Sequence, residues 1–234
     1  MLFRIREGII FLNLLLLIVL TACNHTAAEE EIYTYLEKAV RIESEFIEQQ
    51  NKIINLEAEE QEIYNEIINL GMDEIDRIKD LATKAMGNIN KRSDLIAEEK
   101  ENIHSSEEEF QKTKDYIERI KEKDIKEIAK ALYDKMEKRY SSYDKLNEAY
   151  IESLELESEL YEMLQNKDLK QENLTEHINK INKGYEKVLD ANETFNTYTI
   201  EYNELKREFY ELANIDVTYE ELPSKDEETN KKGN

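Results

Sequence analysis

Helix-breaking residues and cysteine are scarce in this chain, which has five glycines, one proline and a single cysteine, Cys23. A lone cysteine forms no intrachain disulfide, and once a modification occupies it, no thiol nucleophile is left for cysteine-hydrolase chemistry. Tryptophan is absent, and 37% of the side chains are charged. This composition departs from that of an average globular domain and favours long helices.

Positive charge is also in short supply. The 54 acidic residues outnumber the 32 basic residues, which gives a formal net charge of -22. Because nucleic-acid phosphates repel such a surface, we expect no nucleic-acid partner. The same charge opposes broad adsorption to anionic lipid headgroups or wall polymers, unless divalent cations bridge the like charges.

An apolar run, interrupted only by Asn13, occupies positions 9–20 behind two arginines. At about 12 residues it is shorter than the roughly 20 that a membrane-spanning helix needs, although such a helix is the alternative interpretation. The run ends in Leu20-Thr21-Ala22-Cys23, the pattern of a bacterial lipobox. We therefore predict cleavage between Ala22 and Cys23 and attachment of diacylglycerol to the Cys23 sulfur.

The lipobox sets the predicted organisation of the chain. We assign residues 1–22 to a lipoprotein signal peptide, 23–30 to the lipidated cysteine and a spacer, 31–213 to a helical bundle, and 214–234 to a disordered charged tail that contains Pro223. Acyl chains on Cys23 would hold the mature protein on the extracytoplasmic face of the cell membrane.

Amphipathic patterns predict the first two helices. Apolar residues recur at spacings of three and four from Ile32 to near Gly71, where a glycine with positive φ would end the helix. A second segment carries a stripe of residues seven apart: Ile75, Ala82, Ile89, Ile96, Ile103, Phe110 and Ile117. A strict seven-residue repeat indicates a left-handed supercoil. Its companion positions are polar (Arg92, Glu99, Ser106 and Thr113), so we expect a narrow seam within one chain and not a coiled-coil dimer.

Two further helices are predicted over residues 125–164 and 174–212. Asp124 and Glu127 have the spacing of a capping box at the start of the third helix. Four long helices joined by short turns run antiparallel to their neighbours. The predicted fold class is therefore all-α, an elongated four-helix up-and-down bundle with a left-handed twist.

Five short strings occur in a distinctive order and spacing: Tyr64-Asn65, Met136-Glu137-Lys138-Arg139-Tyr140, Lys167-Asp168-Leu169, Asn182-Lys183-Gly184-Tyr185-Glu186 and Ala191-Asn192-Glu193-Thr194-Phe195-Asn196. Together with the lipobox they resemble the YkyA family of lipoproteins from Gram-positive bacteria, whose name refers to cell-wall binding. The resemblance spans nearly the whole mature chain. It implies an elongated four-helix bundle near the wall, and it supplies no catalytic residue.

Two short patterns resemble catalytic motifs without their usual companions. Glu101 and His104 have the E-x-x-H spacing of di-iron bundles, but His177 has Leu174 three residues before it and provides no second motif. Ser142 and Lys145 match S-x-x-K, but the partner motifs of serine acyl enzymes are missing from the sequence. We therefore expect no metal site, no cofactor and no catalytic residue.

Tyrosine is the most abundant aromatic residue of the chain, and nine of the fourteen tyrosines lie between Tyr133 and Tyr210. Those on the apolar stripes are expected to fill a thin core with the hydroxyl at its edge: Tyr140, Tyr143, Tyr185 and Tyr202. Off-stripe tyrosines, Tyr133, Tyr161 and Tyr210, are candidates for an aromatic strip that contacts sugar rings or a partner helix.

These observations predict a non-enzymatic, lipid-anchored protein between membrane and cell wall that binds peptidoglycan or another envelope protein. One alternative is a scaffold or spacer, in which the helices only set a distance from the membrane. The other is a wall hydrolase that uses carboxylates in a groove between helices, which is less expected because helical rods seldom provide a deep pocket.

Overall fold

The computed structural model describes residues 27–217, and this part of the chain is helical without strands. Its elements are α1 (Ala27–Ile42), the 3₁₀ helix η1 (Glu43–Glu45), α2 (Phe46–Ile67), the 3₁₀ helix η2 (Met72–Glu74), α3 (Ile75–Gln111), α4 (Thr113–Ile117), α5 (Lys123–Leu164) and α6 (Gln171–Leu212). In these residues we find no helix with both the length and the apolar character to cross a bilayer. The all-α prediction is confirmed.

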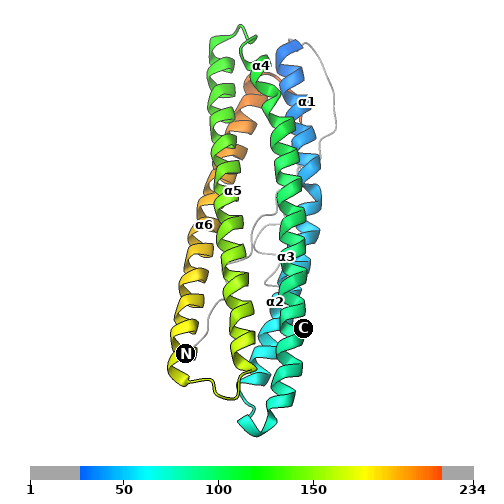
Figure 1. The fold of residues 1–234 in the computed structure, drawn as a ribbon. Helices are drawn as coiled ribbons and strands as arrows, with labels where there is room; N and C mark the ends of the chain where they lie inside the picture. The colour runs from blue at the N-terminus through cyan, green and yellow to red at the C-terminus, as the bar shows by residue number, and fades with distance from the viewer. Residues whose placement is uncertain (1–26, 218–234) are drawn as a thin grey trace, which may run out of the picture.

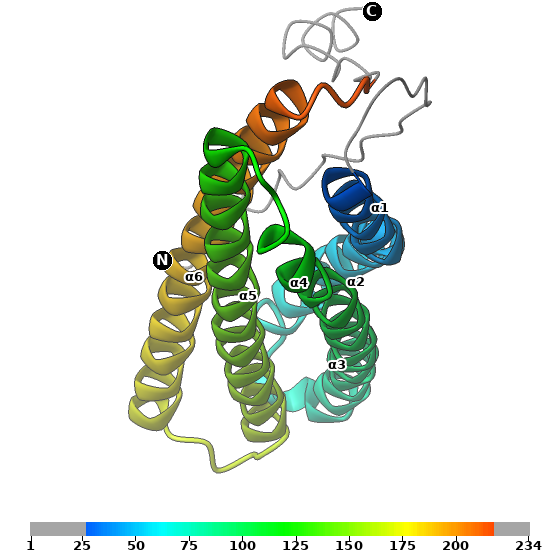
Figure 2. The ribbon, with the colours of Figure 1, turned by 90° about the horizontal axis from the view of Figure 1, so that it is seen from above.

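The helices lie side by side along one long axis (Figure 1). At a rise of 1.5 Å per residue, the 42 residues of α5 extend about 63 Å. Seen from above, α5 and α6 form a hairpin beside the group of α1, α2 and α3 (Figure 2). The elongated helical bundle is thus as predicted, whereas its left-handed, up-and-down topology stays a prediction.

The start of the bundle differs from the predicted boundaries. Helix α1 begins at Ala27, so the last four residues of the expected spacer are helical and Glu29 is already buried. The first predicted helix is divided, because α1 ends at Ile42 and a 3₁₀ turn precedes α2. Cys23 and the predicted cleavage site lie outside the described residues.

Two predicted helix-end signals were wrong. Gly71 has a φ of -84°, and α2 ends four residues before it, so no left-handed glycine ends that helix. Helix α5 begins at Lys123 behind Glu122 without a side-chain cap. Asp124 therefore lies in the first turn, where its charge favours the positive end of the helix dipole without capping it.

The end of α6 is ordered by a Schellman motif. Asn214 has a φ of 52°, a left-handed conformation that asparagine tolerates better than most residues. The Ile215 amide donates to the Tyr210 carbonyl at 2.9 Å, and the Asn214 amide donates to the Glu211 carbonyl at 3.2 Å. Ile215 is buried, so the predicted tail does not begin at residue 214. Residues 218–234 lie outside the described range.

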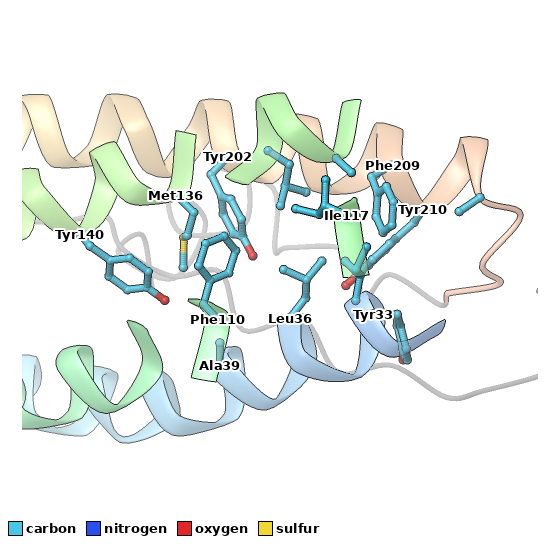
Figure 3. Packing of buried hydrophobic residues seen from close by; sticks show 14 of the residues in the cluster. Tyr33, Leu36, Ala39, Phe110, Ile117, Met136, Tyr140, Tyr202, Phe209 and Tyr210 are labelled. Atoms are coloured by element: carbon cyan, nitrogen blue, oxygen red, sulfur yellow. The ribbon is translucent and has the colours of Figure 1, made fainter. Parts of the chain in front are cut away.

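The seven-residue stripe forms the core as predicted, since each of its seven members is at most 5% exposed. Around Phe110 the core is rich in aromatic rings, with Tyr140 and Tyr202 at centroid distances of 5.9 and 6.5 Å (Figure 3). A second apolar cluster near the α2–α3 turn includes Ile63, Ile78 and Tyr161. The two clusters stabilise the two ends of the bundle.

The companion positions of the stripe are buried as well, which corrects the expectation of a narrow seam. Arg92 and Glu99 are each 3% exposed, and Ser106 and Thr113 are fully buried. A bundle interior with charged residues requires partners for them. These partners define the most unusual region of the molecule.

Candidate functional site

Three polar rungs cross the interior of the bundle. Each joins a residue of the η1–α2 arm to a residue of α3 and a residue of α5. From one rung to the next, the residue number rises by seven in the η1–α2 arm and falls by seven in α3. The rungs are Glu43 with Ser106 and Arg139, Gln50 with Glu99 and Tyr143, and Glu57 with Arg92 and Tyr150. Because residue numbers rise along α2 as they fall along α3, the two helices are antiparallel.

The Arg92 rung concentrates acidic groups around one guanidinium. Arg92 Nη1 donates to Glu60 Oε2 and to Glu157 Oε2, both at 2.6 Å. Its Nη2 donates to Glu57 Oε1 at 3.2 Å and to the Tyr150 hydroxyl at 2.9 Å. Three carboxyl groups thus share one positive charge inside the bundle.

Protonation of one of these carboxyl groups, Glu60, reduces the excess of negative charge around Arg92. Burial, and then the nearby Glu157 carboxylate, raise the pKa of Glu60 to about 8, so that Glu60 is mostly protonated at neutral pH. Burial also raises the pKa of Glu57. The Tyr185 hydroxyl donates to the second Glu157 oxygen, Oε1, at 2.7 Å. The carboxyl groups are therefore engaged by protein donors and held in place.

The middle rung has no positive charge among its hydrogen-bond partners in the described chain. Gln50 Nε2 donates to Glu99 Oε2 at 2.6 Å, and the Tyr143 hydroxyl donates to Glu99 Oε1 at 2.9 Å. Burial raises the pKa of Glu99 to about 7. Glu99 is consequently a buried acid that titrates near neutral pH.

The Glu43 rung contains a bidentate ion pair between Glu43 and Arg139. Arg139 donates to both Glu43 oxygens, at 3.0 and 2.7 Å, and its Nε donates to Thr199 Oγ1 at 3.1 Å. Ser106 Oγ adds a bond of 2.8 Å to Glu43 Oε1. A bidentate pair with its remaining donors satisfied is the form in which buried charges are least costly. Nearer the start of α1, the pair of Lys206 Nζ and Glu37 Oε1, 2.7 Å apart, makes a similar link.

The three candidate tyrosines do not form an exposed strip. Tyr161 is 2% exposed and Tyr210 is fully buried, so neither presents a ring face to a ligand, which corrects that expectation. Their positions inside are explained by buried carboxylates: the Tyr210 hydroxyl donates to Glu37 at 2.7 Å, and Tyr161 is hydrogen-bonded to Glu60. Burial next to these acids raises the pKa of both phenols.

Tyr133 is the candidate that stays half-buried. Its ring stacks on Phe110 at a centroid distance of 5.2 Å and an interplanar angle of 22°, with Lys114 Nζ 5.7 Å from its centroid. The tyrosines assigned to the core follow the prediction more closely, since Tyr140, Tyr143 and Tyr202 are at most 3% exposed. Tyr185 is half-buried.

The two motif-like patterns are not assembled into sites. His104 Nε2 lies 3.1 Å from Asp144 Oδ1 on the surface, and the described residues contain no group of three or more metal-ligating side chains with suitable geometry. Ser142 is buried and donates to the Arg139 carbonyl at 2.7 Å, whereas Lys145 is exposed. His177 Nε2 lies 2.7 Å from the Leu156 carbonyl oxygen, an interior hydrogen bond between α6 and α5.

This chain is similar to a curated protein in sequence and to a solved structure in fold. A curated protein from Bacillus subtilis (strain 168), "Uncharacterized lipoprotein YkyA", is 43% identical over 109 residues, which cover 47% of this chain and 49% of that protein. The matched stretch thus spans about half the length of that relative. A crystal structure of a conserved protein of unknown function from Staphylococcus aureus has a TM-score of 0.57. It covers 79% of this chain and 94% of its own, and at 16% identity it shows a shared fold alone.

The family comparison extends over the bundle. A family model described as "YkyA: Putative cell-wall binding lipoprotein" matches residues 27–212, from the first residue of α1 to the last of α6. Neither this description nor that of the Bacillus protein names an enzymatic activity. The chain belongs to the YkyA family.

Proposed function

We propose that this protein is a non-enzymatic lipoprotein, anchored through Cys23 on the extracytoplasmic face of the cell membrane, whose bundle binds peptidoglycan. The observation that supports this proposal most is the family match over residues 27–212, with its reference to cell-wall binding. The lipobox at residues 20–23 supports the anchor. We also propose an up-and-down, left-handed arrangement of the helical arms, for which the seven-residue stripe is the support.

The geometry of the interior argues against the hydrolase alternative. Glu57, Glu60 and Glu99 have raised pKa values, and they are bonded to protein groups inside the bundle. Burial, and then the neighbouring Glu137, also raise the pKa of the half-buried Glu107, which accepts a hydrogen bond from Gln111. Arg92 Nη1 lies 2.6 Å from both Glu60 and Glu157, where a glycosidase requires room for a sugar and a water molecule. These acids are structural in our proposal.

Tyr133 is the ring that we propose to contact a wall sugar. It is half-buried, stacked on Phe110 and flanked by Lys114, so part of a ring that is held in place remains exposed. Retention of the mature fragment, residues 24–234, on purified sacculi tests wall binding. We expect more fragment to sediment with sacculi than a comparably acidic control protein, and equal retention would contradict wall binding.

Tyr133→Leu gives a matched test of the ring, because leucine keeps apolar packing on Phe110 without the aromatic face. We expect this variant to retain its helical circular dichroism and to sediment less with sacculi than the unmodified fragment. The control is Tyr64→Leu, another half-buried tyrosine, in the last turn of α2. An equal loss in both variants would remove Tyr133 from the proposal.

The second candidate function is a scaffold that holds an envelope partner at a fixed distance. It is favoured by the polar rungs, because an interior of bonded ion pairs across several helices resists bending and sliding of the arms. Chemical crosslinking in intact cells distinguishes the candidates. A scaffold would yield a crosslinked protein, whereas a wall binder would yield attached peptidoglycan fragments.

A further inference from the structure

A pair of tyrosines marks the surface between α1 and α4. The ring centroids of Tyr35 and Tyr116 lie 5.6 Å apart, and both side chains are half-exposed. Arg119 Cζ lies 4.8 Å from the Tyr116 centroid, and Lys112 Nζ lies 6.0 Å from the Tyr35 centroid. Each ring is therefore paired with a long cationic side chain. We call these four residues the α1–α4 patch.

The charge around the α1–α4 patch differs from that of the whole chain. Helix α1 and residues 112–126 together hold eight basic and eight acidic residues, so this face is neutral within a chain of net charge -22. One of the four acids, Glu118, is neutralised by Lys126 and Lys130 at 3.0 and 2.9 Å. Arg119 itself is exposed. Lys112 is itself paired with Glu109 at 2.5 Å, so the patch offers two aromatic rings and the Arg119 cation to an anionic surface.

The patch is close to the proposed anchor. Ala27 follows Cys23 by four positions in the sequence, and an extended chain of that length reaches at most about 14 Å. Tyr35 follows Ala27 by eight helical residues, about 12 Å along α1. Figure 1 shows α4 beside α1 at the end of the bundle where α1 begins. A lipid on Cys23 would therefore keep the patch within reach of the bilayer surface.

We propose that the α1–α4 patch contacts the anionic headgroups of the membrane that holds the anchor, so that the bundle leans on the bilayer through α1 and α4. This inference rests on the proposed lipidation of Cys23. Tyrosine and arginine combine an apolar body with a polar or charged tip, and both settle at the boundary between headgroups and acyl chains. The acidic remainder of the bundle is repelled by the same lipids, which leaves this face toward the membrane.

Because the chain contains no tryptophan, a single introduced tryptophan reports the environment of its own site by fluorescence. Tyr116→Trp places the single indole of the chain in the patch, and Tyr64→Trp places it on a half-buried site of α2 at the opposite end. The mature chain, residues 23–234, is coupled through its only thiol, Cys23, to maleimide-bearing lipid in vesicles of phosphatidylglycerol and phosphatidylcholine. This tether replaces the natural lipid, so the test does not depend on lipidation in the cell.

We expect the fluorescence of the Tyr116→Trp protein to shift to the blue and to be quenched by brominated lipids on vesicles that contain phosphatidylglycerol. The Tyr64→Trp protein should show neither effect. Adding Arg119→Gln should lower the equilibrium constant for contact of the indole with the membrane about fivefold, the contribution of one cation near an anionic surface. Lys79→Gln, which removes an exposed cation near the start of α3, should leave it unchanged.

Equal spectra for the two indole positions would overturn the α1–α4 contact, as would a Tyr116→Trp signal that ignores phosphatidylglycerol. Failure of the proposed function would be seen in different experiments: Cys23 would carry no lipid in cells, or the fragment would not bind sacculi. The two failures are therefore distinguishable.

Discussion

Replacement of Glu99 by glutamine should stabilise this protein, and more so as the pH rises. Glu99 is 3% exposed, and burial raises its pKa from an ordinary value of 4.5 to about 7. An acid whose pKa is raised in the folded state binds its proton more tightly there than in the unfolded chain. The folded protein therefore loses stability as the pH rises from about 4.5 to about 7, where Glu99 must ionise in the interior.

The magnitude follows from the difference between the two pKa values. The raised pKa of Glu99 lowers the free energy of unfolding by about 3 kcal/mol above neutral pH and by about 1 kcal/mol at about pH 5. Glutamine does not ionise and keeps both hydrogen bonds: its oxygen accepts from Tyr143, and its amide donates to Gln50 after that side chain turns over. We therefore expect Glu99→Gln to raise the free energy of unfolding by up to about 3 kcal/mol at about pH 8.

Chemical denaturation of the mature fragment, followed by circular dichroism at about pH 5 and about pH 8, measures this difference. Glu98→Gln is the matched control, because Glu98 is the exposed neighbour on the same helix and should change stability by less than about 0.5 kcal/mol. Glu60 titrates in the same direction, but it is common to both proteins and cancels in the comparison. A Glu99→Gln protein that is less stable than the unmodified fragment at the higher pH would refute the reasoning, as would a pH-independent gain.

Three other substitutions test separate parts of the structure. Arg92→Met leaves three buried carboxyl groups without their cation and should cost about 3–5 kcal/mol in denaturation experiments, with a smaller loss at acidic pH where those groups are protonated. A loss that is the same at all pH values would contradict the charge argument. Phe110→Ala removes a fully buried ring and should cost about 3–5 kcal/mol, whereas Ile200→Ala, at an exposed site, should change stability little. Cys23→Ser should abolish incorporation of a labelled fatty acid in cells, and continued labelling would place the lipid elsewhere.

The buried apolar stripe was predictable from the sequence because its pattern lies within single helices. Ile103 and Phe110 belong to a seven-residue repeat within a single helix, and any helix with that repeat turns those residues to one side. The sequence does not predict the polar rungs, because a charged residue is expected on the surface unless its buried partners are known. Arg92 is buried by Glu60 and Glu157, which lie 32 and 65 residues away in the sequence. The available signal was the recurrence of Arg92 and Glu99 at the same seven-residue interval.

The candidate tyrosines failed for a related reason. The helical pattern predicts that a tyrosine outside the apolar stripe lies on the surface. Tyr210 and Tyr161 instead find carboxyl groups inside the bundle, on Glu37 and Glu60. The helix ends were also not predictable from the sequence. The 3₁₀ turn η1 and the uncapped start of α5 depend on how neighbouring helices pack and not on local capping residues.

The chemical order of the rungs also fixes the alignment of α2 against α3. An evenly repeated apolar stripe would tolerate a slip of seven residues, because each apolar side chain would meet another of its kind. The same slip in one direction would bring Glu57 opposite Glu99, two carboxyl groups with no cation between them. In the other direction Gln50 would face Arg92 and leave the guanidinium without its α2 carboxylate. The polar rungs thereby select a single register of α2 against α3.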